Sequence, residues 1–361
     1  MSISADARWM ALAYAQANRA VGRTSENPAV GCVILSSTGQ VVGVGHTQQG
    51  GRPHAETTAL AMAGLSAKDG TAYVTLEPCA HYGKTPPCAQ ALIAAGIGRV
   101  VIGVGDPDER VSGKGIAMLE QAGIGITLLD DLIYERPMTG FLSVKRKGRA
   151  FITVKMATCQ NGHIAESRDQ QSWLTGPVSR AFVHDLRSRT NVMLTASGTI
   201  RADNPSMSVR IKGYNGKQPA LAIMDSHASL PADAACLAVD RPVYLYHNKQ
   251  AHLPDYPAHV LAIETPYDGT LDCQFVISDL TARQYNHIMV EAGARLFASL
   301  SDAGLVDELI WLRAPKALKD GIIAWQSSDK MDFSAPSAYM IGNHFSLGQD
   351  DAFILSPQKG S

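Results

Sequence analysis

One histidine and two cysteines constrain the first half of this chain more than any other feature. His54 is followed by Ala55 and Glu56, and Cys79 and Cys88 come later in the segment EPCAHYGKTPPC. One imidazole and two thiolates form the ligand set of a catalytic zinc, whose fourth position stays open for water. We expect Cys79 to follow a strand and Cys88 to open a helix, whose positive terminus favours the thiolate.

Glu56 is expected to move protons rather than to bind the metal. Zinc lowers the pKa of its water to near neutrality, and a carboxylate beside the ligand His54 can pass that proton to a ring nitrogen and to leaving ammonia. His-x-Glu followed by Pro-Cys-x-x-Cys is typical of zinc nucleobase deaminases, although here eight residues separate the two cysteines. The sequence therefore predicts hydrolytic removal of an amino group from a nitrogen heterocycle.

Two other interpretations of these residues stay open. The cysteines could be unrelated core residues beside a surface histidine, or the metal could be structural. A structural zinc has a fourth protein ligand, for which His81 is the nearby candidate. We expect His81 to line the pocket instead.

Length and composition limit the classes of protein to which this chain can belong. A chain of 361 residues exceeds what one core usually organises, so two domains are expected. The net charge of −1 gives no basic footprint for nucleic acid or for a membrane surface, which favours a small diffusing substrate. The sequence shows no secretory signal and no long apolar run, and six cysteines are too few for a disulfide scaffold, so we expect a cytoplasmic protein.

Hydrophobic periodicity predicts alternating helices and strands in both halves. The first half is expected to form a three-layer α/β domain, with helices at 9–20, 55–63, 88–95 and 115–121 and strands at 29–35, 41–44, 72–75 and 100–104. The basic run at 145–149 is interpreted as a solvated linker. Further strands are expected at 150–157, 192–195, 220–224, 242–246, 259–263, 287–290 and 308–312.

The motifs of the first half resemble those of a known family. The segment EPCAHYGKTPPC, the triplet at 54–56 and the stretch ENPAVG at 26–31 are similar to the markers of bifunctional riboflavin-biosynthesis deaminase/reductases. The resemblance runs the length of the chain. It implies a cytidine-deaminase-like α/β/α domain at 1–147 and a dihydrofolate-reductase-like α/β domain at 148–361.

The second half shows no G-x-G-x-x-G motif after a strand, so an ordinary dinucleotide fold is not indicated. Its segments SWLT at 172–175, DLR at 185–187, TIRADNP at 199–205 and VEAG at 290–293 resemble the reductase of the same family. The resemblance implies deamination of 2,5-diamino-6-ribosylamino-4(3H)-pyrimidinone 5′-phosphate. NADPH then reduces the ribosyl group, which gives 5-amino-6-ribitylamino-uracil 5′-phosphate.

Site roles follow from the same resemblance, position by position. In the deaminase, zinc is bound by His54, Cys79 and Cys88, Glu56 is the proton donor and acceptor, and the pocket is formed by Asn27, His46, His81, Lys84 and Asp106. In the reductase, NADPH contacts Thr158, Trp173, Thr199, Asp203, Ser226, Gly293, Ala294, Arg295, Leu296, Phe297, Ala298 and Ser299. The substrate there meets Gln171, Arg187, Met207, Arg210 and Glu291, and Lys155 assists hydride transfer.

Four positions depart from the family pattern, which commonly has DPNP after the fourth strand and K-x-A-x-S-x-D-G in the reductase. Here the corresponding residues are Asp108, Cys159 and Asn161, and Gln171 replaces a serine two places before the tryptophan.

Two other function classes remain as alternatives: a nucleoside or tRNA deaminase with a partner domain, and a reductase with a regulatory zinc module. The resemblance also implies a homodimer, formed through the reductase halves.

Overall fold

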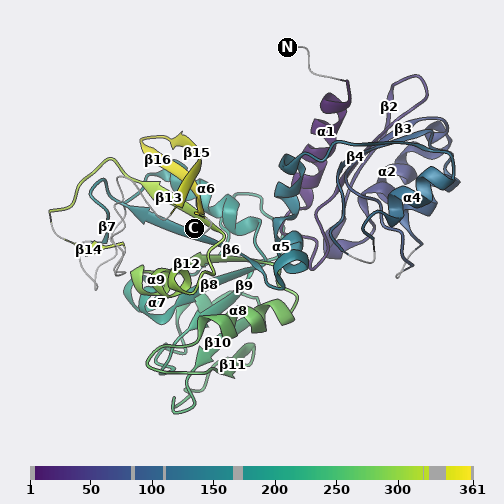
Figure 1. The fold of residues 1–361 in the computed structure, drawn as a ribbon. Coiled ribbons are helices and arrows are strands. Elements are labelled where there is room, and N and C mark those ends of the chain that lie inside the picture. Colours follow the sequence, from purple (N-terminus) through teal and green to yellow (C-terminus); the bar gives the residue numbers. More distant parts are fainter. Residues whose placement is uncertain are drawn as a thin grey trace. The chain divides into compact units, whose positions relative to one another are not determined.

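The computed structural model describes residues 5–82, 86–108, 111–165, 174–319, 321–324 and 339–358. The chain divides into two compact units, Met1–Arg149 and Ala150–Ser361. Each unit has its own sheet, which Figure 1 shows with its helices. None of the helices in the described ranges has the length and apolar character needed to cross a membrane.

A five-stranded sheet forms the centre of the first unit, in the order β2-β1-β3-β4-β5. Its strands are β1 (Gly31–Leu35), β2 (Val41–His46), β3 (Thr71–Leu76), β4 (Arg99–Val104) and β5 (Gly125–Leu128). Strand β1 is antiparallel to both β2 and β3, whereas β3, β4 and β5 are parallel. Every residue of β1 is buried, as expected for a strand covered on both faces.

Helices cover both faces of this sheet, which confirms the predicted three-layer domain. The helical segments are α1 (Ala5–Ala20), η1 (Gln49–Gly51), α2 (Ala55–Ala63), η2 (Gly64–Ala67), α3 (Cys88–Ala94), α4 (Lys114–Gln121), η3 (Leu132–Met138) and α5 (Thr139–Lys147). Helix α1 packs on β1 and β3 and contacts η3, while α3 contacts both α2 and α4. Figure 1 shows α1 and α2 on opposite faces.

Two glycines of β2 fix the position of α2. A Cβ atom at Gly43 would lie 2.3 Å from the carbonyl oxygen of Ala59, and one at Gly45 would lie 2.3 Å from that of Ala55. Only glycine allows the helix backbone to approach the strand so closely. The first turn of α2, which carries Glu56, is therefore held against the sheet.

The basic run is not a linker, so that interpretation of residues 145–149 was wrong. Lys145, Arg146 and Lys147 form the last turn of α5, and Gly148 ends the helix in a left-handed conformation. Positive side chains at a helix C-terminus interact favourably with the helix dipole. Arg146 also forms an ion pair with Glu135, with one N–O distance of 2.7 Å.

The second unit is built on a nine-stranded sheet in the order β11-β10-β9-β8-β12-β6-β13-β16-β15. The strands of this unit are β6 (Phe151–Thr158), β7 (His163–Ala165), β8 (Val192–Ala196), β9 (Ala220–Met224), β10 (Val243–His247), β11 (Val260–Glu264), β12 (His287–Glu291), β13 (Glu308–Arg313), β14 (Ile322–Ile323), β15 (Tyr339–Leu347) and β16 (Asp350–Pro357). Its helical segments are α6 (Pro177–Ser188), α7 (Ser197–Asp203), η4 (Ala235–Ala238), α8 (Cys273–Ala282) and α9 (Ala294–Asp302).

Seven neighbouring strands, from β11 to β13, run parallel, and β16 and β15 complete the sheet as an antiparallel hairpin. Strand β8 shows how both faces are buried, because Val192 and Leu194 enter one core and Met193 enters the other. The predicted α/β class of this unit is confirmed. The hairpin was not predicted, since most residues of β15 are exposed and carry no apolar alternation.

Candidate functional site

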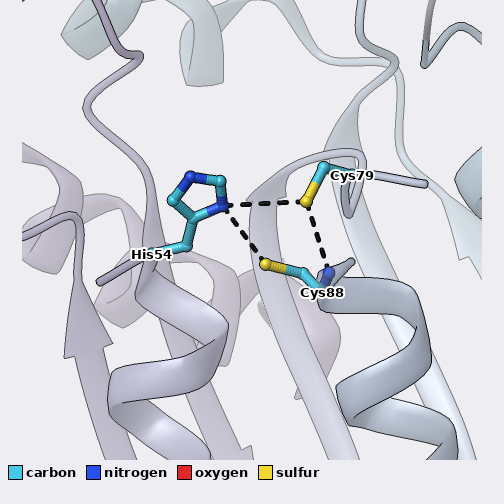
Figure 2. Close-up of side chains that lie close together, drawn as sticks. All are labelled: His54, Cys79 and Cys88. Atoms are coloured by element: carbon cyan, nitrogen blue, oxygen red, sulfur yellow. Dashed lines mark hydrogen bonds between the residues drawn. The ribbon is translucent and has the colours of Figure 1, made fainter. Parts of the chain in front are cut away.

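Three side chains of the first unit converge on one point (Figure 2). His54 is the residue directly before α2, Cys79 lies in the loop after β3, and Cys88 is the first residue of α3. His54 Nδ1 lies 3.3 Å from Cys88 Sγ and 3.7 Å from Cys79 Sγ. The backbone N–H of Cys88 also donates to Cys79 Sγ over 3.3 Å. Three segments that are separate in sequence thus present their ligand atoms together.

This donor set fits a zinc ion. Tetrahedral bonds of about 2.0–2.1 Å to nitrogen and about 2.3 Å to sulfur place the ligand atoms about 3.6 Å apart, close to what is found here. All three ligand atoms lie within 4.8 Å of one another. Within the described ranges His81 is not part of this group, so the set has three protein ligands and one position for water.

The three side chains alter one another's pKa values. A hydrogen bond with the Cys88 side chain lowers the pKa of Cys79 to about 4, and His54 adds to this effect. The same contact raises the pKa of Cys88. Glu56 is 4% exposed and in hydrogen-bond contact with the Cys88 side chain, and its burial raises the pKa of its carboxyl. A buried carboxyl therefore lies beside the ligands without being one of them.

Of the predicted pocket residues, three lie near the loops that lead to this group. Asn27 packs against Gly51, where a Cβ atom would lie 2.0 Å from Asn27 Nδ2. His46 ends β2, and its pKa is lowered by burial and by Arg19 and Arg23, which favours the neutral imidazole. In the described part of the chain the buried Nδ1 of His81 has no hydrogen-bond partner. Lys84 lies outside the described residues.

Asp106 and Asp108 occupy the loop after β4, and both are buried. The Asp106 carboxylate accepts a hydrogen bond from the backbone N–H of Asp108 over 2.8 Å. Burial raises the pKa of Asp106 to about 6. The Asp108 carboxylate, which departs from the family pattern, forms an ion pair of 2.8 Å with Lys145. The carboxylate that departs from the family pattern is thus paired with the ammonium group of a lysine on α5.

In the second unit, an ion pair brings together two residues predicted to bind substrate. Arg187 donates to both oxygens of Glu291, over 2.6 and 2.9 Å, and to the Ser208 carbonyl over 2.9 Å. Lys155 is the register partner of Glu291 on the neighbouring strand. Burial lowers the pKa of Lys155, while Glu291 opposes that shift. Three predicted residues, from within β6, from α6 and from the end of β12, therefore form one charged cluster.

Met207 and Arg210 lie on the segment that contacts this cluster. Met207 is buried with a positive φ of 51°, and Arg210 Nη1 donates to Ser206 Oγ over 2.7 Å. Sequence reasoning missed Arg241, which donates to the carbonyls of Met207 and Ser206 over 2.7 and 2.6 Å. No motif marks a buried arginine that bonds only to backbone, so its role could not be read from the sequence.

The predicted cofactor residues come from several elements. Thr199 and Asp203 lie on α7, Ser226 follows β9, and Gly293 directly precedes α9. A Cβ atom at Gly293 would meet nothing within 4 Å, so there is open space before the first turn of α9. The backbone N–H groups of that turn fit a phosphate group of NADPH. Leu296 and Phe297 are buried, so only their backbone could take part.

Thr158 and the departures at 159 and 161 have structural contacts. Thr158 is fully buried, and its hydroxyl accepts a hydrogen bond from Trp311 Nε1 over 2.8 Å. Cys159 Sγ donates to Asn161 Oδ1 over 2.7 Å, and Asn161 in turn bonds to the backbone of Leu318. Trp173 and Gln171 lie outside the described residues.

Comparison with known families matches both units. Residues 3–104 match the cytidine and deoxycytidylate deaminase zinc-binding region, and residues 150–327 match the RibD C-terminal domain.

Similar proteins cover almost the whole chain. The riboflavin biosynthesis protein RibD of Haemophilus influenzae is 41% identical over 310 residues, which is 82% of each chain. The structure of Acinetobacter baumannii RibD has a TM-score of 0.86 at 30% identity and covers 98% of this chain and 99% of its own. A Thermotoga maritima diaminohydroxyphosphoribosylaminopyrimidine deaminase/5-amino-6-(5-phosphoribosylamino)uracil reductase has a TM-score of 0.86 at 28% identity, with 97% and 98% coverage. The chain belongs to the RibD family of bifunctional deaminase/reductases in riboflavin biosynthesis.

Proposed function

We propose that residues 1–147 deaminate 2,5-diamino-6-ribosylamino-4(3H)-pyrimidinone 5′-phosphate and that residues 148–361 reduce the ribosyl group of the product. The convergence of His54, Cys79 and Cys88 beside the buried Glu56 carries the first assignment. The similarity to the Thermotoga enzyme supports both substrates.

In the deaminase, this chain's residues bind, orient and move protons. His54, Cys79 and Cys88 would hold zinc, which supplies a Lewis acid that makes water nucleophilic at neutral pH. Glu56 takes one proton from the attacking water and delivers it to the ring nitrogen, and it then moves the remaining proton of that water, from the hydroxyl formed at the ring carbon, to the amino group that leaves as ammonia. Asn27, His46, His81, Lys84 and Asp106 orient the pyrimidine and its phosphate, with His81 offering a buried nitrogen that no described residue engages.

In the reductase, the charged cluster binds the sugar phosphate. NADPH supplies the hydride when bound at Thr199, Asp203, Ser226 and the 293–299 turn, together with Trp173. Lys155 provides a proton near the ring-opened ribose, and its pKa lowered by burial suits proton transfer. Glu291 holds Arg187 in place, while Arg187, Met207, Arg210 and Gln171 contact the substrate. Thr158 is fully buried and its hydroxyl accepts a hydrogen bond from Trp311, so its side chain is assigned no contact with NADPH.

We also infer a homodimer formed through the reductase halves, on family resemblance alone, and light scattering of the purified chain tests it. A small-molecule substrate without nucleic acid or membrane partners is consistent with the net charge of −1. The six cysteines form no disulfide, which supports a reducing, cytoplasmic setting.

A coupled assay tests the two activities together. Ammonia release from the diaminopyrimidine phosphate is followed first, and NADPH oxidation by the product is followed next. Glu56→Gln should lower ammonia release by about a hundredfold or more, and Thr57→Ala, at the exposed neighbouring position, should leave it unchanged. Ammonia release that is equal in wild type and Glu56→Gln would refute the proton-transfer role. No release by the wild type would refute the substrate.

A further inference from the structure

Glu77, which precedes the Pro78-Cys79 pair, has no role in the reaction as described so far. Its side chain is 3% exposed, yet its carboxylate is fully engaged. One oxygen, Oε2, accepts hydrogen bonds from the backbone N–H groups of Asp106 and Gly113 over 3.3 and 3.0 Å. The other, Oε1, accepts from those of Gly115 and Ile116 over 3.0 and 3.3 Å.

These four donors belong to both ends of one loop. Asp106 lies near the beginning of the segment after β4, and Gly113, Gly115 and Ile116 surround the start of α4. The Glu77 carboxylate therefore closes the loop and supplies acceptors for N–H groups that a helix leaves free at its N-terminus. A carboxylate distant in sequence accepts these hydrogen bonds, because α4 has no side-chain cap of its own.

The backbone next to Glu77 makes a second contact with the same helix. A Cβ atom at Gly115 would lie 2.0 Å from the carbonyl oxygen of Pro78, so α4 begins directly against that residue. Pro78 immediately precedes the zinc ligand Cys79. One short segment, 77–79, thus carries a metal ligand at one end and the anchor of the Asp106 loop at the other.

We propose that Glu77 is a positioning residue that holds Asp106 at a fixed place relative to Cys79 and so sets substrate affinity in the deaminase. This inference rests on the deaminase function proposed above and on the role of Asp106 in the pocket. Glu77 acts through the loop, since its carboxylate accepts hydrogen bonds only from backbone N–H groups among the residues that the structure describes.

Only a carboxylate can accept hydrogen bonds from all four backbone N–H groups at this position. Two oxygens with two acceptor sites each can take four N–H donors, whereas glutamine has one oxygen and directs an NH₂ group at the remaining donors. Glu77→Gln therefore keeps the shape of the side chain and loosens one end of the loop. Glu77→Asp keeps the charge but draws the oxygens back by one methylene group.

Steady-state kinetics of ammonia release distinguish positioning from folding. For Glu77→Gln we expect KM to rise about tenfold while kcat stays within about threefold of wild type, the pattern of lost ground-state binding. Zinc content and NADPH oxidation by the same chain should be unchanged. Glu120→Gln, on the exposed side of α4, is the matched control and should keep the wild-type KM.

A double mutant shows whether Glu77 works through Asp106. If it does, the KM of Glu77→Gln/Asp106→Asn should be close to that of Asp106→Asn alone, because the two changes disturb one interaction. If Glu77→Gln does not fold, Glu77→Asp gives the same comparison.

An unchanged KM with a lower melting temperature would overturn the inference, as would fully additive effects in the double mutant. Failure of the wild type to release ammonia would instead refute the proposed function.

Discussion

The two units differ in how their functional residues are distributed along the chain. In Met1–Arg149 the metal ligands and Glu56 lie between positions 54 and 88, and the ligand atoms of His54, Cys79 and Cys88 lie within 4.8 Å of one another. In Ala150–Ser361 the charged cluster draws Lys155, Arg187 and Glu291 from strands and helices far apart in sequence. The first site is concentrated and the second is dispersed.

This difference explains why only one site can be read from spacing. A zinc ion demands particular ligand atoms at fixed distances, so few residue types satisfy it and their order is informative. A nucleotide pocket is built largely from backbone N–H groups and common side chains, such as the open turn at Gly293. Family resemblance was needed to identify the second site.

Metal removal should separate the two units most sharply. A chelator should reduce ammonia release by at least about a thousandfold, because zinc contributes several kcal/mol to such reactions. NADPH oxidation with already deaminated substrate should be unchanged. Added zinc should restore ammonia release, and a parallel loss of both activities would contradict the division into independent sites.

Loss of Arg187 should have the next largest effect, confined to the second unit. Arg187→Leu leaves the Glu291 carboxylate buried without its partner, which we expect to destabilise this unit by about 3–5 kcal/mol. The exposed pair of Arg189 and Asp185, at 2.9 Å, is the control, and Arg189→Leu should cost about 0.5 kcal/mol or less. Urea denaturation followed by hydrogen exchange in β12 measures both. Equal losses of stability in the two variants would show that burial of the ion pair does not increase the cost of breaking it.

The sequence predicted most of the fold where periodicity is strong. Buried strands such as β1 and β8 were found because their residues are apolar, and the alternation of strands with helices indicated the α/β class. The hairpin of β15 and β16 was missed because β15 is mostly exposed. Helix α5 was missed because its basic last turn looks like a solvated linker, although Lys145 is held by Asp108.

The sequence predicted chemical types in the site, but not the contacts among them. It identified Glu56 as the acid beside the zinc ligands, since the motif places it there. It gave Glu77 no role, because the four N–H groups that Glu77 binds lie beyond β4 and become neighbours only in the fold. The same holds for Arg241, whose partners are backbone carbonyls.

A pH-dependent difference in stability is expected in the first unit. Burial raises the pKa of Asp106 to about 6; the hydrogen bond from the Asp108 backbone and the charge of Lys145 oppose this shift, and the charges of Asp108 and Glu77 add to it. Its protonated form is therefore favoured in the folded state. The stability that this proton contributes is fully present below about pH 4 and is lost as pH rises through about 6.

Asp106→Asn, which cannot ionise, should become more stable than wild type by up to about 3 kcal/mol between pH 4 and pH 7. Hydrogen exchange in β4 measures this difference. A difference that does not change with pH would show that Asp106 titrates near its ordinary pKa.

The smallest effect is expected at Cys159, where the second unit departs from its family. A serine there would keep the hydrogen bond to Asn161 that the thiol makes over 2.7 Å, and the side chain is fully buried away from solvent. Cys159→Ser should therefore leave NADPH oxidation within about twofold and stability within about 1 kcal/mol of wild type. Asn161→Ala should cost about 2 kcal/mol, because it also removes both contacts with the Leu318 backbone. A large kinetic effect of Cys159→Ser would mean that this turn contacts the substrate or cofactor directly, and the dispersed site would then extend to the end of β6.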